Sequence, residues 1–185
     1  AMWGEPRFRA SQIWGWVYRR LAAGFDQMTN LPRSLRERLS RFYRLDPLTP
    51  LDEHFSEDGL TQKVLFTLPD GALIESVLMH YEQRHSVCVS SQVGCPVGCA
   101  FCATGQAGFD RNLTPAEIIA QPLYFARQLQ DQGAAVTNVV LMGMGEPLLN
   151  YDAVWEAIER WNDHQGFDLG ARRITISTAG YVPDR

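Results

Sequence analysis

The four cysteines of this 185-residue chain all lie between Cys88 and Cys102. Three of them, Cys95, Cys99 and Cys102, have the spacing C-x3-C-x2-C, which places three thiolates on one short loop. Three such ligands can hold three irons of a [4Fe–4S] cubane, and the fourth iron then stays open to a cofactor or substrate. A structural zinc site normally takes four ligands in paired spacings, and the nearest histidines lie upstream. The spacing therefore favours an iron–sulfur cluster over zinc.

Three further features carry groups that can do chemistry. The segment VTNVVLMGMGEP predicts a buried strand that runs into a glycine turn with Gly145 and Glu146. Glu75 stands within the apolar β-rich run ALIESVLM, where a carboxylate is costly unless it meets a partner or a cavity. Cys88 lies between two valines, so strand alternation points its side chain to the face opposite theirs. An ordinary strand-to-helix turn, an outward-facing glutamate and a buried strand cysteine are the alternative interpretations.

The pattern from Leu60 onward predicts the elements that position these residues. Two β-rich runs flank a PDG turn at 69–71, a third run covers 86–90, and a helix follows the capping box of Thr114 and Glu117. Further expectations are a kink at Pro122, a second helix capped by Asn150 and a buried final strand in RRITISTAG. Strands that alternate with helices call for parallel pairing through right-handed crossovers. The predicted fold class is α/β, either a (β/α) barrel or an open doubly wound sheet.

A basic helical block precedes these elements. Residues 1–44 hold nine arginines and three acidic residues, which gives a net charge of +6. Because the whole chain has a net charge of −4, residues 45–185 have a net charge of −10. An apolar stripe predicts a helix over 10–21, and a second helix starts near Pro32 and buries Leu35, Leu39 and Phe42. Arginines with an exposed Trp16 between them favour RNA binding, by phosphate neutralisation and base stacking. A solvated basic face, with Trp16 packed under a neighbouring element, is the alternative.

The composition of the chain predicts its domain boundaries and its cellular compartment. The acidic, proline-containing segment LDPLTPLDEHFSEDG predicts a linker, with a helical accessory domain at 1–50 and a second domain at 51–185. The longest apolar runs are short and the first twenty residues are rich in charge, so we expect neither a membrane span nor a signal peptide. We therefore expect a cytoplasmic protein without a membrane partner. In that reducing compartment clustered cysteines are more often metal ligands than structural disulfides.

Two motifs carry a family resemblance. CPVGCAFC resembles the signature of radical S-adenosylmethionine (SAM) enzymes, and MGMGEP resembles the glycine and glutamate motif that contacts the methionine part of SAM in that superfamily. Together with RRITISTAGYVP and QIWGWVYRR, these motifs are similar to the RlmN/Cfr family of RNA adenine methyltransferases, most of all to its RlmN branch. The resemblance implies part of a (β/α)6 radical SAM barrel behind a helical accessory domain and a β-hairpin. It also implies methylation of carbon 2 of adenosine in 23S rRNA and tRNA.

The resemblance assigns roles to the cofactor-binding positions. Cys95, Cys99 and Cys102 would hold a [4Fe–4S] cluster whose open iron binds SAM. Gly145, Glu146 and Ser177 would contact the bound SAM. A flavodoxin-type protein would supply the electrons.

The resemblance also assigns two catalytic residues. Glu75 would accept the proton of the adenine ring, and burial would raise the pKa of its carboxyl. Cys88 would release the product by forming a transient disulfide with the cysteine that carries the methyl group. That cysteine lies in the C-terminal part of the family's proteins, and no cysteine follows Cys102 here. We therefore expect this chain to be a fragment that does not complete turnover.

Two other functions stay open on the sequence. One is a different radical SAM enzyme, for which Cys88 would be dispensable. The other is a non-catalytic RNA-binding module in which an iron–sulfur cluster or zinc only holds a loop. Cleavage of SAM to 5′-deoxyadenosine separates these possibilities, because a purely structural metal would not support it.

Overall fold

The computed structural model describes residues 3–181 and begins with the predicted helical block. The helices α1 (Phe8–Tyr18) and α2 (Arg33–Phe42) are joined through a short 3-10 helix, η1 (Phe25–Gln27). We call residues 3–45 the helical unit. Its core consists of Ala22, Phe25, Met28, Leu31, Leu35 and Leu39. The prediction that Phe42 joins this core is wrong: Phe42 is the last residue of α2, is 63% exposed, and contacts the Trp3 ring instead.

Trp16 packs within the helical unit rather than standing free. Its ring contacts the core of that unit, and its Nε1 donates a hydrogen bond to Asn30 Oδ1 at 2.6 Å. The Arg20 guanidinium lies over the ring, 4.4 Å from the ring centroid. Trp16 therefore follows the alternative interpretation, since its ring already has partners within the unit.

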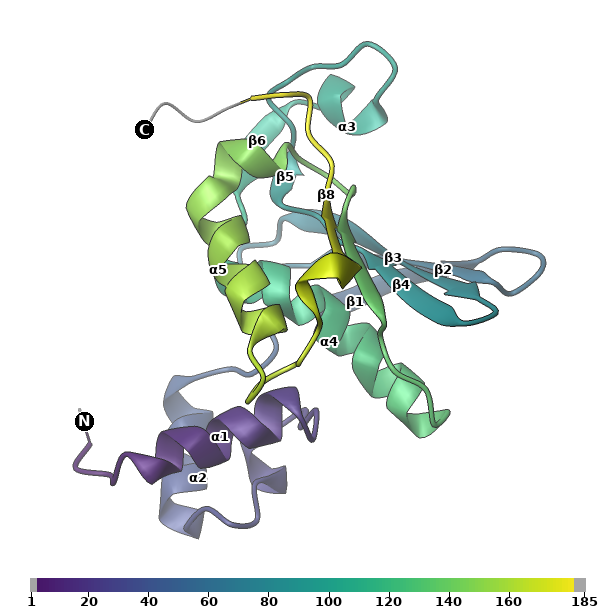
Figure 1. Ribbon diagram of the computed structural model, residues 1–185. Helices are drawn as coiled ribbons and strands as arrows, with labels where there is room; N and C mark the ends of the chain where they lie inside the picture. The colour runs from purple at the N-terminus through teal and green to yellow at the C-terminus, as the bar shows by residue number, and fades with distance from the viewer. Residues whose placement is uncertain (1–2, 182–185) are drawn as a thin grey trace.

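A six-stranded sheet follows, in the order β1-β2-β3-β4-β7-β8 (Figure 1). Its strands are β1 (Thr49–Phe55), β2 (Thr61–Thr67), β3 (Leu73–Tyr81), β4 (Arg84–Cys88), β7 (Asn138–Leu141) and β8 (Ile174–Ile176). The first four are antiparallel neighbours, whereas β4, β7 and β8 are parallel. Both the hairpin at 69–71 and the parallel pairing were predicted, and the structure confirms them.

Two strands differ from expectation. β1 lies within the predicted linker, so the proposed boundary at residue 50 falls inside a strand. The residues of β1 are exposed throughout. β8 was expected to be buried, but Thr175 and Ile176 are exposed because β8 is an outer strand of the sheet.

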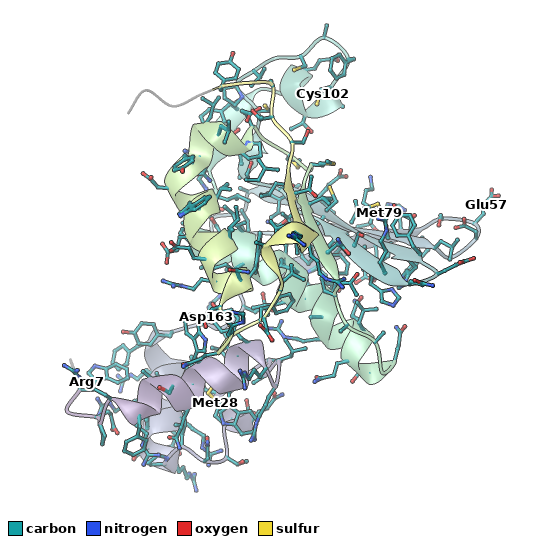
Figure 2. All side chains as sticks on the ribbon, viewed as in Figure 1. Arg7, Met28, Glu57, Met79, Cys102 and Asp163 are labelled. Atoms are coloured by element: carbon teal, nitrogen blue, oxygen red, sulfur yellow. The ribbon has the colours of Figure 1, made fainter. Side chains whose placement is uncertain are left out.

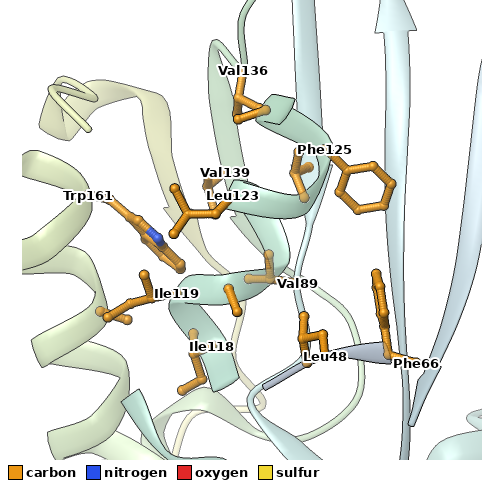
Figure 3. Packing of buried hydrophobic residues seen from close by; sticks show 14 of the residues in the cluster. Leu48, Phe66, Val89, Ile118, Ile119, Leu123, Phe125, Val136, Val139 and Trp161 are labelled. Atoms are coloured by element: carbon orange, nitrogen blue, oxygen red, sulfur yellow. The ribbon is translucent and has the colours of Figure 1, made fainter. Parts of the chain in front are cut away.

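Two helices cover one face of the sheet and form the main core with it. α4 (Pro115–Asp131) begins at the predicted capping box, and α5 (Tyr151–Asn162) follows the 3-10 helix η2 (Pro147–Asn150). Figure 3 shows Val139 of β7 and Val89, the residue after β4, packed near Ile118 of α4 and Trp161 of α5. α4 continues as one helix through Pro122. A last 3-10 helix, η3 (Ala171–Arg173), leads into β8.

The Asn150 side chain does not cap α5 as predicted. Its Nδ2 donates instead to the carbonyls of Ser91 and Leu113, both at 2.8 Å. These buried bonds tie the start of α5 to the segment that follows β4 and to the segment that leads into α4.

Hydrogen bonds connect the helical unit to residues 49–181, which we call the sheet domain, and an ion pair fixes the short segment between the two. Arg127 of α4 donates from Nε to the Leu21 carbonyl of the helical unit at 3.1 Å, and it forms an ion pair with Asp46, the residue that follows this unit. Arg19 donates to the His164 carbonyl at 2.5 Å. Within residues 3–181, no helix has the length and apolar character that crossing a membrane requires.

Candidate cofactor and active site

A small β-ribbon holds the cysteine loop. β5 (Gln92–Gly94) pairs with β6 (Phe109–Asn112), and the loop between them contains the short helix α3 (Ala103–Gln106). The ribbon closes tightly at Gly94, whose φ is +73° and where an added Cβ would lie 2.1 Å from the Gly108 carbonyl oxygen. Cys95 N–H donates to that same carbonyl at 2.9 Å. The loop was predicted from the cysteine spacing, whereas the ribbon that fixes both of its ends was not.

The three predicted cluster ligands line one cavity of about 400 Å³. Cys95, Cys99 and Cys102 are partly exposed free thiols. Among residues 3–181, no three His, Cys, Asp or Glu side chains converge closely enough to hold a single metal ion. Hydrogen bonds from backbone N–H groups, Gly105 first, lower the pKa of Cys102 and so favour the thiolate that binds iron. Three soft sulfur donors facing a cavity fit an iron–sulfur cluster.

The glycine turn lines another part of this cavity. Gly145 has a φ of +103°, and an added Cβ would lie 2.6 Å from the Gln92 side chain. At Gly143 an added Cβ would lie 2.8 Å from the Val89 backbone. Both glycines are needed because the turn lies directly against the segment 89–92. Gly143, Gly145, Glu146 and Ser177 line the same cavity as the cysteines.

Glu146 is buried and connects three segments. Its backbone N–H donates to Gln92 Oε1 at 2.8 Å. Its carboxylate accepts from Leu148 N–H at 3.0 Å and from Ala179 N–H at 2.7 Å. Because both carboxylate oxygens are occupied by backbone donors, Glu146 holds the cavity wall together. This arrangement brings the exposed Ser177, two residues before Ala179, to the cavity.

A buried polar segment, Ser90 to Gln92, supports the site, and the sequence analysis did not identify it. The Ser90 hydroxyl donates to the Glu75 carbonyl at 2.6 Å and accepts from Met144 N–H at 2.9 Å. Gln121 of α4 bonds both the N–H and the carbonyl of Ser90, at 2.7 and 2.9 Å. The available signal was the run of polar residues SSQ directly after an apolar strand.

Cys88 lies on the sheet face opposite the helices, as the alternation predicted. Val87 and Val89 are fully buried in the core, whereas Cys88 is partly exposed on the other face. Its cross-strand neighbours are Val77 of β3 and Val140 of β7. Burial raises the pKa of the Cys88 thiol, and a hydrogen bond from Met142 N–H offsets only part of this.

Glu75 lies on the same face as Cys88, one strand away. In the register of β3 and β4, Val77 faces Cys88, and Glu75 is two residues from Val77. The expected burial is not found, since the side chain is 43% exposed. Its charge is nevertheless partnered, because Lys63 Nζ of β2 lies 2.9 Å from Glu75 Oε1. Lys63 was not among the predicted site residues.

Figure 2 places Cys102 at α3, at the opposite end of the molecule from Arg7 and Met28 of the helical unit. The cluster cavity and the helical unit therefore lie at opposite ends of the molecule. A substrate that contacts both must be large.

Comparison with protein families identifies the class of protein. Residues 89–185, more than half of the chain, match the model of the radical SAM superfamily. The chain therefore belongs to the radical SAM superfamily. Residues 1–45 match the ribosomal RNA large subunit methyltransferase N-terminal domain.

Individual relatives narrow the class further. A probable dual-specificity RNA methyltransferase RlmN from Chloroflexus aurantiacus is 50% identical over 97% of this chain and 49% of its own length. A protein of the same name from Dictyoglomus thermophilum is 46% identical over 98% of this chain and 51% of its own length. This chain spans about half the length of the curated relatives it matches. These matches confirm the resemblance to RlmN proteins.

A solved structure confirms the fold. The crystal structure of a radical SAM methyltransferase from Sphaerobacter thermophilus matches with a TM-score of 0.93 and 50% identity, over 96% of this chain and 52% of that chain. The prediction of part of a radical SAM barrel is therefore correct.

Proposed function

We propose that this chain carries the cofactor-binding part of a radical SAM methyltransferase that acts on carbon 2 of adenosine in 23S rRNA and tRNA. The observation that supports this best is the shared cavity, which joins the C-x3-C-x2-C thiols to the glycine turn and Ser177. Cys88 and Glu75 lie together on the neighbouring open face of the sheet.

The cavity residues would bind and orient the cofactors. Cys95, Cys99 and Cys102 would hold the [4Fe–4S] cluster, while the backbone around Gly145 and the Ser177 side chain would contact SAM. When bound, the cluster and SAM supply one-electron chemistry that removes hydrogen from an unreactive carbon. Carbon 2 of adenine has no nucleophilic character, so a polar methyl transfer would not reach it. Glu146 would keep the two walls of the cavity together.

The open face would handle the proton and the thiol chemistry. Glu75 would accept the proton lost from the adenine ring, with Lys63 balancing its charge at 2.9 Å. Cys88 would release the product by forming a disulfide with the methyl-carrying cysteine of the family. That cysteine has no counterpart in this sequence, because none follows Cys102. The complete cycle thus needs a further cysteine.

RNA would bind through the arginines of the helical unit, which carry most of the positive charge. We propose cytoplasmic ribosomal and transfer RNA as substrates and a flavodoxin-type protein as the electron donor. Support for RNA comes from the match of residues 1–45 to a ribosomal RNA methyltransferase domain and from the printed names of the relatives.

Anaerobic reconstitution tests the proposal on this chain itself. The chain is loaded with iron and sulfide, reduced, and measured by electron paramagnetic resonance with and without SAM. We expect a cubane signal that changes when SAM is added, and formation of 5′-deoxyadenosine.

Two matched variants sharpen the test. Cys99→Ala should lose the cluster, whereas Cys88→Ala should keep both the cluster and the response to SAM, because Cys88 lies outside the cavity lining. Stoichiometric zinc without a cluster, in a chain shown to be folded by circular dichroism, would contradict the proposal.

A further inference from the structure

A second cavity lies between the two helices of the helical unit, far from the cluster site. Its volume is about 510 Å³, within the range of small-molecule sites. The apolar part of the lining comes from both helices and from the segment before α1, and it consists of Trp3, Pro6, Ala10, Ile13, Leu35 and Leu39. The Trp3 ring is held there by Phe42 and Tyr43, with ring centroids 5.9 and 5.7 Å away. The cavity thus has a largely apolar lining that includes the Trp3 side chain.

An arginine in the lining has an unmet hydrogen-bond donor. Arg9 donates from Nη1 to Gln12 Oε1 at 2.8 Å and to the Asn30 carbonyl at 3.1 Å, which fixes its guanidinium. Its Nε is buried and has no acceptor among the described residues. A buried unpaired donor costs free energy, which favours a shift of the Arg9 side chain that turns Nε toward an acceptor on a ligand in the cavity. Glu5, also in the lining, offers an acceptor for an amino group.

The charge around the cavity indicates the kind of ligand. Arg7 and Arg9 line it, and Arg38 lies over the Trp3 ring, 4.3 Å from the centroid. Residues 1–44 carry a net charge of +6. An apolar cavity amid arginines suits a flat ring that carries hydrogen-bonding edges and is attached to phosphates.

We propose that this cavity binds a single unpaired nucleobase of the RNA substrate, with Arg9 Nε donating to the base and Arg7 contacting a neighbouring phosphate. This inference rests on the proposed function, because it takes the polymer to be RNA. It adds a site for base capture at the end of the molecule away from the cluster (Figure 2). The helical unit would then recognise unpaired nucleotides as well as phosphate charge.

The test compares two tryptophan variants of this chain. Ala10 is exposed and lines the cavity, so Ala10→Trp should fill it. Ser11 is the next residue of α1, is exposed and does not line the cavity, so Ser11→Trp is the matched control. The probes are a labelled single-stranded oligoadenylate and the same backbone with abasic spacers, and binding is followed by fluorescence anisotropy at one fixed salt concentration.

We expect Ala10→Trp to weaken binding of the oligoadenylate about tenfold, as the loss of one stacked base would. Ser11→Trp should bind like the unsubstituted chain, and the abasic probe should not distinguish the three proteins. Equal binding of oligoadenylate by both variants, with melting curves that show both are folded, would overturn the proposal. Failure of the unsubstituted chain to bind RNA would overturn it together with the RNA role of the helical unit, while SAM cleavage at the cluster would test the radical chemistry separately.

Discussion

At the scale of single residues, Gly145 lets the glycine turn lie directly against Gln92 of β5. A side chain there would meet Gln92 in a backbone conformation that favours glycine. We expect Gly145→Ala to lower the free energy of unfolding by about 3 kcal/mol, from the left-handed backbone and the forced displacement of Gln92. Chemical denaturation measures this change.

Gly133→Ala is the control for backbone strain alone. Gly133 also has a positive φ, +71°, but an added Cβ would meet nothing within 4 Å. We expect a loss of about 1 kcal/mol there. Equal losses at the two glycines would mean that the contact with Gln92 is unimportant.

The partial burial of Cys88 should change the pH at which its thiol reacts. Burial raises the pKa of its thiol above the ordinary 9.0, so at any given pH less thiolate is present than in a free cysteine. With the three ligand cysteines replaced by serine, we expect half-maximal alkylation by iodoacetamide at a pH above 9.0, and a return toward that value in urea. The same midpoint in the folded and unfolded chains would contradict the burial of Cys88.

Much of the site at this scale was predictable. The cysteine spacing and the glycine turn are local patterns, and the structure places Cys95, Cys99, Cys102, Gly145, Glu146 and Ser177 around one cavity. Their catalytic and binding roles stay predictions. Lys63 was not predictable, because its partner Glu75 is twelve residues away and only the strand register brings the two together.

At the scale of elements, ion pairs join the start of α4 to β6 and to the hairpin turn between β2 and β3. Arg111 of β6 forms ion pairs with Asp70 in the hairpin turn and with Glu117, at 2.7 and 2.8 Å. Burial by itself would raise the pKa of Glu117, but hydrogen bonds from Arg111 and Thr114 outweigh it and hold the pKa below the ordinary 4.5. One carboxylate thus joins β6 to the first turn of α4.

This junction should make stability depend on acid pH. A carboxyl whose pKa is lowered in the folded state adds stability above its ordinary pKa, and that stability is lost as the pH falls through the folded value. We expect the urea concentration at half-unfolding of the parent chain to decrease as the pH is lowered below about 4.5. In Glu117→Gln this decrease should be smaller. At neutral pH this variant should be less stable by about 2 kcal/mol, because charged hydrogen bonds are lost. Identical pH profiles would show that other groups cause the acid dependence.

The elements that the sequence analysis missed share a physical cause. β1 is exposed throughout and contains Pro50, so it lacks the apolar alternation by which strands are recognised. β5 and β6 are three and four residues long, too short for periodicity to appear. Asn150 has the residue type of a helix cap, but two buried carbonyls from other segments compete for its side chain. Long-range pairing determines all three outcomes.

At the scale of the whole molecule, Arg127 holds the helical unit against the sheet domain. Its side chain is 19% exposed and its partner Asp46 is 23% exposed, so water screens their ion pair little. We expect Arg127→Ala to cost about 2 kcal/mol and to speed proteolysis between α2 and β1, because the Leu21 carbonyl also loses its donor. Chemical denaturation and limited proteolysis measure the two effects.

Arg33→Ala is the matched control. Arg33 pairs with Glu37 on an open helix surface, where the two side chains are 85% and 62% exposed. Such a pair contributes about 0.5 kcal/mol or less. Equal proteolysis of the two variants would show that the Arg127 contacts do not hold the units together.

The hydrogen-bond partners of Glu146 are synthesised at different times. Its partners Gln92 and Ala179 lie 54 and 33 residues away along the chain, on either side of it. A chain made from its N-terminus presents the cysteine loop first, then the glycine turn, and the Ala179 segment that completes the wall last. The cysteine loop therefore leaves the ribosome before the segment that completes the cavity wall is made.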